Sequence, residues 1–319
     1  MTSRPRTLTV ATYNLYLGAD LALLFGVTST DELATQVAVV REQLERTDFT
    51  QRAGAVARIL AREQADVVGL QEVSRWATAP VSPEGALGDE EVLADFLPTL
   101  VGALEAAGTP YDVHAVNHNF AGGLPVDGSW MSVGGANVTL VRRGGRFRVR
   151  AERTGTFASG FAVRTGLDGI EFPITRSWGV VEGEVEGGPV VVATTHTEAY
   201  DAATRDAQRD ELLALLDDPG CPVVVLGDFN APPSQVGMPT AYADAWTAAG
   251  NDPRGGATCG QAADLANDVS ALHERIDYVF VRDADVLACH LVGTRDDERT
   301  IPDRLWPSDH AGVVARLGF

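Results

Sequence analysis

Lysine is absent from the sequence: all 25 basic residues are arginine, against 44 acidic residues, and the net charge is −19. Proteins that bind duplex nucleic acid draw much of their affinity from cations that neutralise phosphates. The one cationic concentration, RRGGRFRVRAER, holds six arginines from Arg142 to Arg153, and we expect it to form the solvated face and turn of a hairpin. The charge therefore disfavours long nucleic acid as a partner, although a local patch could still bind a small phosphorylated group.

Cysteine and long apolar runs are also scarce. Cys221, Cys259 and Cys289 are odd in number and form no CxxC pair, which argues against a disulfide framework and against a zinc site. No run approaches the roughly 18 apolar residues of a membrane helix. The start of the chain, MTSRPRTLTVATYN, lacks the apolar segment of a signal peptide. These absences favour a cytoplasmic protein and leave its oligomeric state open.

What is present describes a globular protein with ample material for a core. The 319 residues are 45% hydrophobic, without repeats or a long linker, and we expect one catalytic domain over residues 1–319. Apolar periodicity predicts helices over 31–46, 50–63, 91–107 and 203–216. It predicts strands over 8–13, 66–71, 111–116, 137–141, 146–150, 179–185, 190–195, 223–226, 275–281 and 311–317, and loops over 80–88, 122–135 and 251–260. Strands interspersed with helices indicate an α/β or α+β fold.

Polar residues gather where the predicted strands end. In LGDFNAPPS, Asp228 and Asn230 lie two residues apart and therefore point to the same side of their strand. Asp277 lies in the apolar run RIDYVFV, where an unpartnered carboxylate costs several kcal/mol. Further polar residues at strand boundaries are Asn14, Glu72, His196, Asp309 and His310.

Each of these residues alone has an ordinary structural explanation. Asp228 and Asn230 could cap a turn, His196 could be a core histidine, and Asp277 could pair with Arg275 or Arg282. Together, carboxylates and amides without thiolates form the hard, oxygen-rich set that Mg²⁺ or Mn²⁺ prefers. An Asp–His pair can in addition supply an oriented base.

The order of these motifs resembles that of the endonuclease/exonuclease/phosphatase superfamily, which includes deoxyribonucleases, sphingomyelinases and inositol polyphosphate phosphatases. The motifs that carry the resemblance are TYNLYLG with Asn14, LQEV with Glu72, GGANVTLVR with Asn137, TTHTEA with His196, GDFNA with Asp228 and Asn230, RIDYVFV with Asp277, and SDH with Asp309 and His310. They extend over nearly the whole chain. The resemblance implies a four-layer fold, in which two mixed β-sheets pack face to face with helices outside.

The resemblance also implies roles for the site residues. Glu72 would be the main carboxylate on a magnesium (or manganese) ion, with Asn14 and Asp309 close by. His310 would be the essential histidine, oriented by Asp277. Asp228 would orient or help deprotonate the attacking water, and whether it or His310 takes the proton stays open, with His310 favoured. Asn230 and His196 would donate hydrogen bonds to the phosphoryl oxygens. Asn137 and Arg176 would bind the substrate. The alternative for Arg176 is an exposed position on the surface without a role in binding.

The substrate is the least determined part. The main hypothesis is a magnesium-dependent phosphodiesterase or phosphatase that acts on a small or lipid-like phosphoester. A nuclease is the alternative within the enzymes, and an inactive binding module on the same scaffold is the alternative of another class. The segment Leu21–Phe25 could be an exposed hydrophobic element, but packing as a helical turn is the favoured interpretation.

Overall fold

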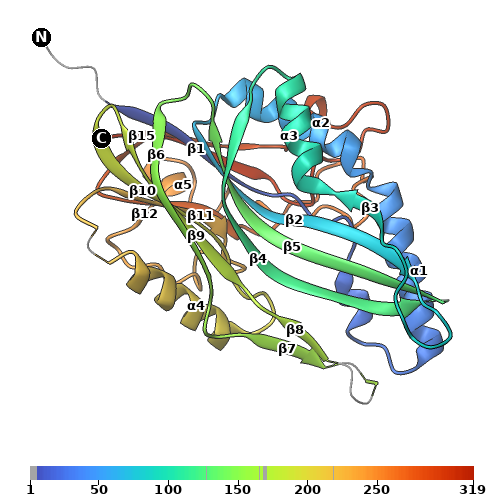
Figure 1. Ribbon diagram of the computed structural model, residues 1–319. Helices are drawn as coiled ribbons and strands as arrows, with labels where there is room; N and C mark the ends of the chain where they lie inside the picture. The colour runs from blue at the N-terminus through green and yellow to red at the C-terminus, as the bar shows by residue number, and fades with distance from the viewer. Residues whose placement is uncertain (1–5, 127, 165, 168–170, 218) are drawn as a thin grey trace, which may run out of the picture.

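The computed structural model describes the chain except for residues 1–5, 127, 165, 168–170 and 218. Two mixed β-sheets form its centre (Figure 1). The seven-stranded sheet has the order β14-β15-β1-β2-β5-β4, with β3 beside β2, and the six-stranded sheet has the order β12-β13-β11-β10-β9-β6. The strands of the first sheet are β1 (Thr7–Asn14), β2 (Val67–Pro80), β3 (Glu91–Asp95), β4 (Tyr111–Val126), β5 (Ser129–Arg142), β14 (Asp285–Val292) and β15 (Gly312–Gly318). Those of the second are β6 (Phe147–Thr156), β9 (Ser177–Val185), β10 (Gly188–His196), β11 (Val223–Asp228), β12 (Ala243–Asp244) and β13 (Asp277–Arg282).

Helices cover the outer face of each sheet. The first sheet packs against α1 (Thr30–Arg46), α2 (Phe49–Glu63) and α3 (Phe96–Ala106), and the second against α4 (Ala202–Leu215). The remaining elements are η1 (Leu21–Leu24), α5 (Ala245–Ala248), η2 (Asp296–Glu298) and the hairpin of β7 (Phe161–Arg164) and β8 (Glu171–Ile174). A third core lies between the sheets, where Val10 and Val67 meet Val192 and Leu226. The predicted four-layer α+β arrangement is therefore confirmed.

The two sheets approach each other closely at Gly69 in β2. A Cβ atom there would lie 2.9 Å from the Cβ atom of Leu226 in β11, so a larger residue would push the sheets apart. The hydroxyls of Thr139 and Thr194 form a 2.8 Å hydrogen bond between the sheets nearby. This spacing fixes the relative position of the strand ends that carry the polar motifs.

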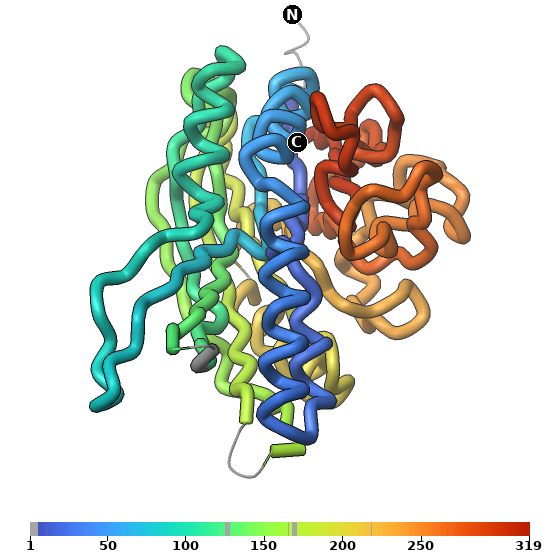
Figure 2. The backbone as a smooth tube through the Cα atoms, turned by 90° about the vertical axis from the view of Figure 1, so that its right-hand side faces the viewer, coloured from blue at the N-terminus to red at the C-terminus, as the bar shows by residue number. Residues whose placement is uncertain are grey.

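Each sheet contains a parallel pair, β1 with β2 and β10 with β11. Helices α1 and α2 connect the first pair and α4 the second, so the carboxyl ends of each pair meet at one edge, where α/β folds place ligands. The first residue of β1 and the last residue of β15 lie at the opposite edge, since Thr7 pairs with Gly318 (Figure 1). In the view turned by 90°, α1 and α2 run along one face and the segment 250–310 gathers beside them (Figure 2). Among the described residues, no helix is long and apolar enough to cross a membrane.

Two element predictions were wrong because strand pairing overrode the local pattern. The glycine-rich segment 122–135 forms the end of the β4–β5 hairpin instead of a loop, because its glycines make room for aromatic rings on the paired strand. The Trp130 ring occupies the place of a side chain at Gly123, and the Phe120 ring does so at Gly135. Residues 91–95 were predicted as the start of a helix but pair with β2 as β3, and the helix begins only at Phe96.

The arginine-rich segment was also assigned wrongly. It is the connection by which the chain leaves the first sheet after β5 and enters the second at β6, so it is not a hairpin. Its arginines pair with carboxylates: Arg142 with Asp66 at 2.8 Å and Arg143 with Asp112 at 2.6 Å. These contacts offset the charge of Arg142 and Arg143. Arg150 and Arg153 also face carboxylates, of Glu184 and Glu182, while Arg148 is exposed.

Candidate active site

The polar strand ends converge on one rim between the two sheets. Neighbouring strands place His196, Asp228 and Asp277 side by side, since His196 is paired with Asp228 and Asp228 with Asp277 in the ladder. The amide of Asn14, from the other sheet, donates to Asp228 Oδ2 at 3.0 Å and to Glu72 Oε1 at 3.2 Å. One buried side chain thus connects carboxylates that are far apart in sequence and belong to different sheets.

The backbone at this rim leaves the ordinary strand conformation. Glu72, Asn230 and Tyr16 have φ values of 55°, 47° and 55°, a region that costs free energy for residues other than glycine. At Glu72 the pairing of β2 with β5 shifts register between Leu70 and Val73, and this bulge directs the carboxylate toward Asn14. The backbone amide of Leu17 fixes the other oxygen of Glu72 at 2.8 Å.

His310 and Asp277 form the predicted pair. Nδ1 of the ring lies 2.8 Å from Asp277 Oδ2. Burial opposes a charge on the imidazole, but the carboxylates of Asp277 and Asp309 outweigh it and raise the pKa of His310 well above its ordinary value. The alternative that Asp277 pairs with Arg275 or Arg282 is wrong, because Arg275 binds Asp244 at 2.5 Å and Arg282 lies 3.8 Å from Asp283.

Asp277 is held in place by a residue that the sequence did not single out. The hydroxyl of Thr258, fully buried, accepts from the backbone amides of Ile276 and Asp277 at 3.1 Å each. The backbone of Cys259 forms isolated bridges with Glu274 and His310, so this segment connects both members of the pair. The sequence around Thr258 contains no pattern that predicts this support of Asp277.

Two further carboxyl groups, those of Asp228 and Asp309, have raised pKa values. Burial, followed by the charge of Asp277, raises the pKa of Asp228 to about 7, although His310 opposes this shift. Burial and the charge of Glu72 raise the pKa of Asp309 to about 7, again against His310. Asp228 Oδ1 accepts the backbone amide of Asn230 at 2.8 Å, which orients the carboxylate. Several buried acids therefore share a small space, and a cation would relieve their repulsion.

Arg176 and His196 form the opposite wall. Arg176 is 7% exposed, so the surface alternative for this arginine is wrong. Its Nη1 lies 3.2 Å from Nε2 of His196, and Nε lies 3.6 Å from Glu198. Burial, and then the charges of Arg176 and His310, lower the pKa of His196 well below its ordinary value. His196 is thus neutral near pH 7, and Arg176 carries the positive charge of this wall.

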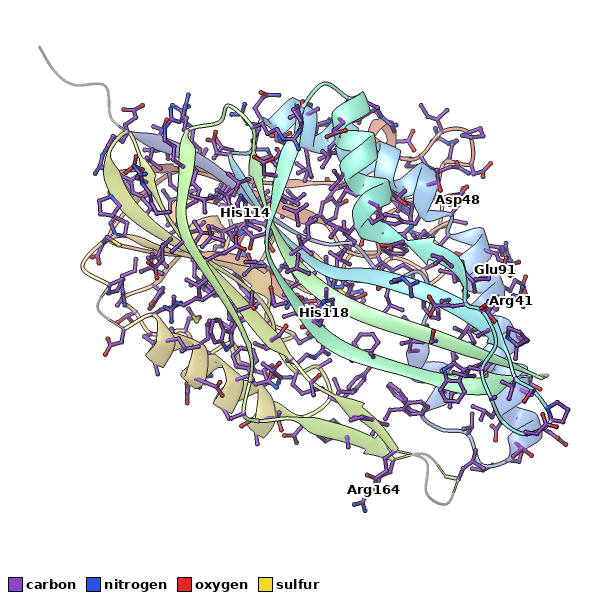
Figure 3. The ribbon with its side chains drawn as sticks, viewed as in Figure 1. Arg41, Asp48, Glu91, His114, His118 and Arg164 are labelled. Atoms are coloured by element: carbon purple, nitrogen blue, oxygen red, sulfur yellow. The ribbon has the colours of Figure 1, made fainter. Side chains whose placement is uncertain are left out.

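Other histidines lie away from the rim. Figure 3 marks His114 and His118 on β4, where His114 pairs with Glu152 at 2.7 Å and His118 is exposed. In the sheet they pair with Thr139 and Ala136 of the Asn137 motif, and among the described residues neither ring lines the cavity at the rim. The chemistry of the rim therefore depends on His196 and His310.

Asn137 lies behind the rim and does not line it. It is fully buried and exchanges hydrogen bonds with Asn119 at 3.0 and 3.2 Å. Ser177 donates to the same Asn119. Asn119 lines the cavity at the rim. Asn119 was missed because a polar residue among the alternating residues of β4 looks like ordinary sheet surface.

A buried arginine joins the two loops that carry Asn14 and Asp309. Arg52 of α2 is fully buried and donates to the carbonyl oxygens of Leu15 at 2.5 Å, Tyr16 at 3.2 Å and Pro307 at 3.2 Å. Its guanidinium also lies 4.9 Å from the ring of Phe49. Burial lowers its pKa to about 10. Arg52 lies on the apolar stripe of its helix. A charged residue at an apolar position of a helix is the sequence signal from which its buried role could have been predicted.

Two sets of side chains could hold a divalent cation. Glu72, Asn14 and Asp309 offer oxygen atoms, and the Asp309 carboxylate has only long contacts, with Ser308 Oγ at 3.4 Å and with His310 Nε2 at 3.9 Å, among the described residues. Asp228, Asp277 and His310 form the other set, with ligand atoms within 4.8 Å of one another. In the second set one of the three ligands is a histidine nitrogen, and Nδ1 of His310 is bound to Asp277, whereas all three ligands of the first set are oxygen donors. The first set therefore fits a hard ion better.

A cavity of about 510 Å³ opens at the rim and continues away from it. Glu72, Arg176, His196, Asp228 and His310 line one end, and side chains of η1, α1, β4, β5 and β8 line the other. Asn14 and Asp277 lie just behind this lining. The structure thus brings the predicted metal, base and phosphoryl groups to one end of a single cavity.

Comparisons with known proteins agree with this fold. A solved endonuclease/exonuclease/phosphatase of Beutenbergia cavernae is 26% identical, with a TM-score of 0.55 over 98% of this chain and 72% of the other. A family protein of Bacteroides thetaiotaomicron is 18% identical, with a TM-score of 0.62 over 99% of both chains. D. rerio TDP2, in complex with a single-strand DNA product, is 16% identical, with a TM-score of 0.58 over 98% of this chain and 99% of that one. The comparison with curated proteins gave no match. The model of the Endonuclease/Exonuclease/phosphatase family matches residues 11–310, and the chain belongs to this family.

Proposed function

We propose that this protein is a phosphodiesterase or phosphatase that cleaves a small or lipid-like phosphoester by attack of an activated water. The observation that carries the proposal is the Asn14 amide, which joins Glu72, on the metal side, to Asp228, on the water side. His310 and Asp277 stand at the same rim as a hydrogen-bonded pair. Family membership supports hydrolysis of a phosphoester bond.

In the proposed mechanism, the neutral form of His310 accepts the proton of the attacking water, and Asp277 stabilises the imidazolium that forms. Because Asp277 and Asp309 raise the pKa of His310, the rate of this step should increase with pH until that pKa is reached. Asp228 orients the same water through the oxygen that is not held by Asn230. The Asn230 amide donates one hydrogen to the Thr197 carbonyl at 2.9 Å and keeps the other for a phosphoryl oxygen. Arg176 and His196 would lie beside the same phosphoryl group, where the guanidinium offsets its developing charge.

Glu72, Asn14 and Asp309 would hold a divalent cation, with Mg²⁺ or Mn²⁺ expected from their oxygen donors. When bound, the ion would supply charge neutralisation at the phosphoryl and leaving-group oxygens. Cys259 is the one thiol on the cavity lining among the described residues, and burial raises its pKa, so it is a poor ligand. The donor chemistry of the rim therefore supports a hard ion.

Activity should be tested with a panel of phosphomonoesters, phosphodiesters, nucleotides and phospholipids, each with Mg²⁺, with Mn²⁺ and with EDTA. We expect turnover of at least one small ester that depends on the added ion. An absence of turnover throughout the panel would support the alternative of a binding module. The presence of every metal and base position in the sequence argues against that alternative.

A nuclease is the second candidate, since D. rerio TDP2 with the same fold is seen with a DNA product. The net charge of −19 and the pairing of Arg142 and Arg143 with acids argue against strong binding to a polyanion. Plasmid nicking at low enzyme concentration should therefore be slower than turnover of the best small ester. Equal rates on both substrates would favour the nuclease.

A further inference from the structure

The far end of the cavity is apolar and lies next to the proposed catalytic rim. Its floor consists of side chains that are less than one tenth exposed: Leu24, Val37, Val40, Trp76 and Met131. Leu124, Val133 and Phe172 add further apolar surface. We call this part of the cavity, lined by these eight residues, the apolar chamber. It belongs to the same continuous space as Glu72 and His310.

Polar atoms near the chamber are already used by the protein. Trp76 Nε1 donates to the Leu17 carbonyl at 2.7 Å, and the Tyr16 hydroxyl donates to the Ala263 carbonyl at 3.0 Å. Asp20 also lines the cavity, but its carboxylate caps η1 by accepting the Ala22 amide at 2.9 Å. A ligand in the chamber would therefore meet mainly hydrocarbon, and a polar group would lose its hydrogen bonds to water there.

An aromatic bridge connects the chamber to the rim. Phe25 contacts Phe172 with ring centroids 5.8 Å apart and meets the edge of Tyr200 at 5.3 Å. These rings come from the residue directly after η1, from β8 and from the loop after β10. The backbone holds the β7–β8 hairpin beside η1, since the Gly166 amide donates to the Val27 carbonyl at 2.9 Å. Across the same hairpin Arg164 pairs with Glu171 at 2.9 Å (Figure 3).

The charges on the lining limit the phosphate content of a ligand. Among the described residues, Arg176 is the one arginine on the cavity wall, and it lies at the rim. Four carboxylates line the same cavity: Asp20, Glu72, Asp228 and Asp309. A substrate with several phosphates would meet more repulsion from these carboxylates than a substrate with one phosphate, and Arg176 can neutralise only one negative charge. The apolar chamber fits a hydrocarbon group and the single arginine fits one phosphate, so the cavity as a whole fits an amphiphilic ligand.

We propose that the apolar chamber binds the alkyl or acyl part of a substrate that carries a single phosphoester group, with the phosphate at the rim. This inference rests on the proposed function and specifies its substrate class. Transfer of each methylene group from water to a hydrocarbon surface would favour binding by about fourfold. The aromatic bridge would then contact the first carbons beyond the ester oxygen.

The inference can be tested with p-nitrophenyl phosphodiesters whose second ester group is methyl, butyl or octyl, used below their micelle concentrations with Mg²⁺ or Mn²⁺. We expect kcat/KM to rise by about threefold to fourfold for each methylene that enters the chamber. Leu124→Glu should remove most of this rise. Leu287→Glu is the matched control, because Leu287 of β14 is 49% exposed and outside the cavity lining, and it should keep the rise.

The outcomes separate the two proposals. If no ester is cleaved with any divalent ion, the proposed function fails. If the methyl ester is cleaved but kcat/KM is flat with chain length, or Leu124→Glu leaves the rise unchanged, the apolar chamber is not the substrate site. A p-nitrophenyl ester of thymidine 5′-phosphate supplies a nucleoside in place of the alkyl group. Faster cleavage of that ester than of the octyl ester would also overturn the inference, in favour of a nucleoside substrate.

Discussion

The two sheets contribute different chemistry to the same rim. The seven-stranded sheet supplies Asn14 and Glu72, and with them the oxygen donors of the proposed metal site. The six-stranded sheet supplies Asp228 and Asp277, and with them the groups that would handle water and the proton. His310 crosses this division, since it precedes β15 of the first sheet but binds Asp277 of the second. The face-to-face packing of the sheets is therefore what assembles the site, and neither sheet carries it alone.

The largest effect should come from the metal side. EDTA should abolish turnover, and Mg²⁺ or Mn²⁺ should restore it. Mutation of a residue that only hydrogen-bonds to a metal ligand typically lowers metal affinity by about 10–100-fold. Glu72→Gln changes a proposed ligand itself, so it should weaken Mn²⁺ binding, measured by titration calorimetry, by at least as much. Asp277→Asn is the control for the second candidate set and should leave Mn²⁺ binding nearly unchanged. Loss of binding in Asp277→Asn but not in Glu72→Gln would move the ion to Asp228, Asp277 and His310.

The next effect tests the contact between the sheets. His310→Ala should lower kcat by about 10²–10⁴-fold, the usual range for a general base. Asp277→Asn should lose less, because it orients the ring and does not itself take the proton. Since the pair acts as a unit, the double variant should be little worse than His310→Ala. Additive losses, or a folded His310→Ala enzyme with near-normal turnover, would show that this histidine is not the base.

A smaller effect is expected at Arg176, on the phosphoryl wall of the six-stranded sheet. Arg176→Gln should lower kcat/KM by about 10–100-fold, as expected for loss of a charge-assisted hydrogen bond of about 1.5–3 kcal/mol. The change also removes the neighbour of the buried Glu198, so the melting temperature has to be measured with the kinetics. Glu198→Gln is the matched control, and it should affect stability more than kcat/KM. Equal kinetic losses in both variants would assign Arg176 a structural role.

The smallest effect should come from Asn137, which supports the rim from within the seven-stranded sheet. Asn137→Ala leaves Asn119 without its reciprocal partner. We expect a loss of stability of about 1–3 kcal/mol from the unsatisfied buried amide, and a change in KM below that of Arg176→Gln. Denaturant unfolding and steady-state kinetics measure both quantities. A loss in kcat/KM as large as that of Arg176→Gln would restore the direct substrate contact predicted from the sequence.

The sequence predicted the fold well because its motifs follow the strand ends. Strand and helix periodicity located β1, α1, α2, α4 and β11 within about two residues. The glycines of residues 122–135 favour a loop when the segment is considered alone. The neighbouring sequence does not show that the Trp130 and Phe120 rings cover Gly123 and Gly135 from the paired strand. The sequence did not predict β3 for a similar reason: residues 91–95 are extended because they pair with β2, and their own sequence does not show this pairing. Pairing between distant segments overrode local propensity in both cases.

The candidate site was predictable where a residue type carries the chemistry itself. Asp277 in an apolar run required a partner, and its contact with His310 follows from that requirement. Residues that support the site from behind gave no such signal: Thr258 accepts two backbone amides, and Asn119 donates to the side chain of Asn137. The apolar chamber also combines residues of β2, β5, β8 and α1, and only the fold brings these together.

Arg52 has a consequence for how the molecule opens. Its guanidinium binds carbonyl oxygens of the loop after β1 and of the loop before β15. If either loop moved away, the buried guanidinium would lose partners that water does not replace, so the two loops should open together. In hydrogen exchange, the backbone amides of Tyr16 and His310 should then share one opening free energy, although they lie 294 positions apart along the chain. The rim would in that case be a single cooperative unit in solution, present whole or absent whole.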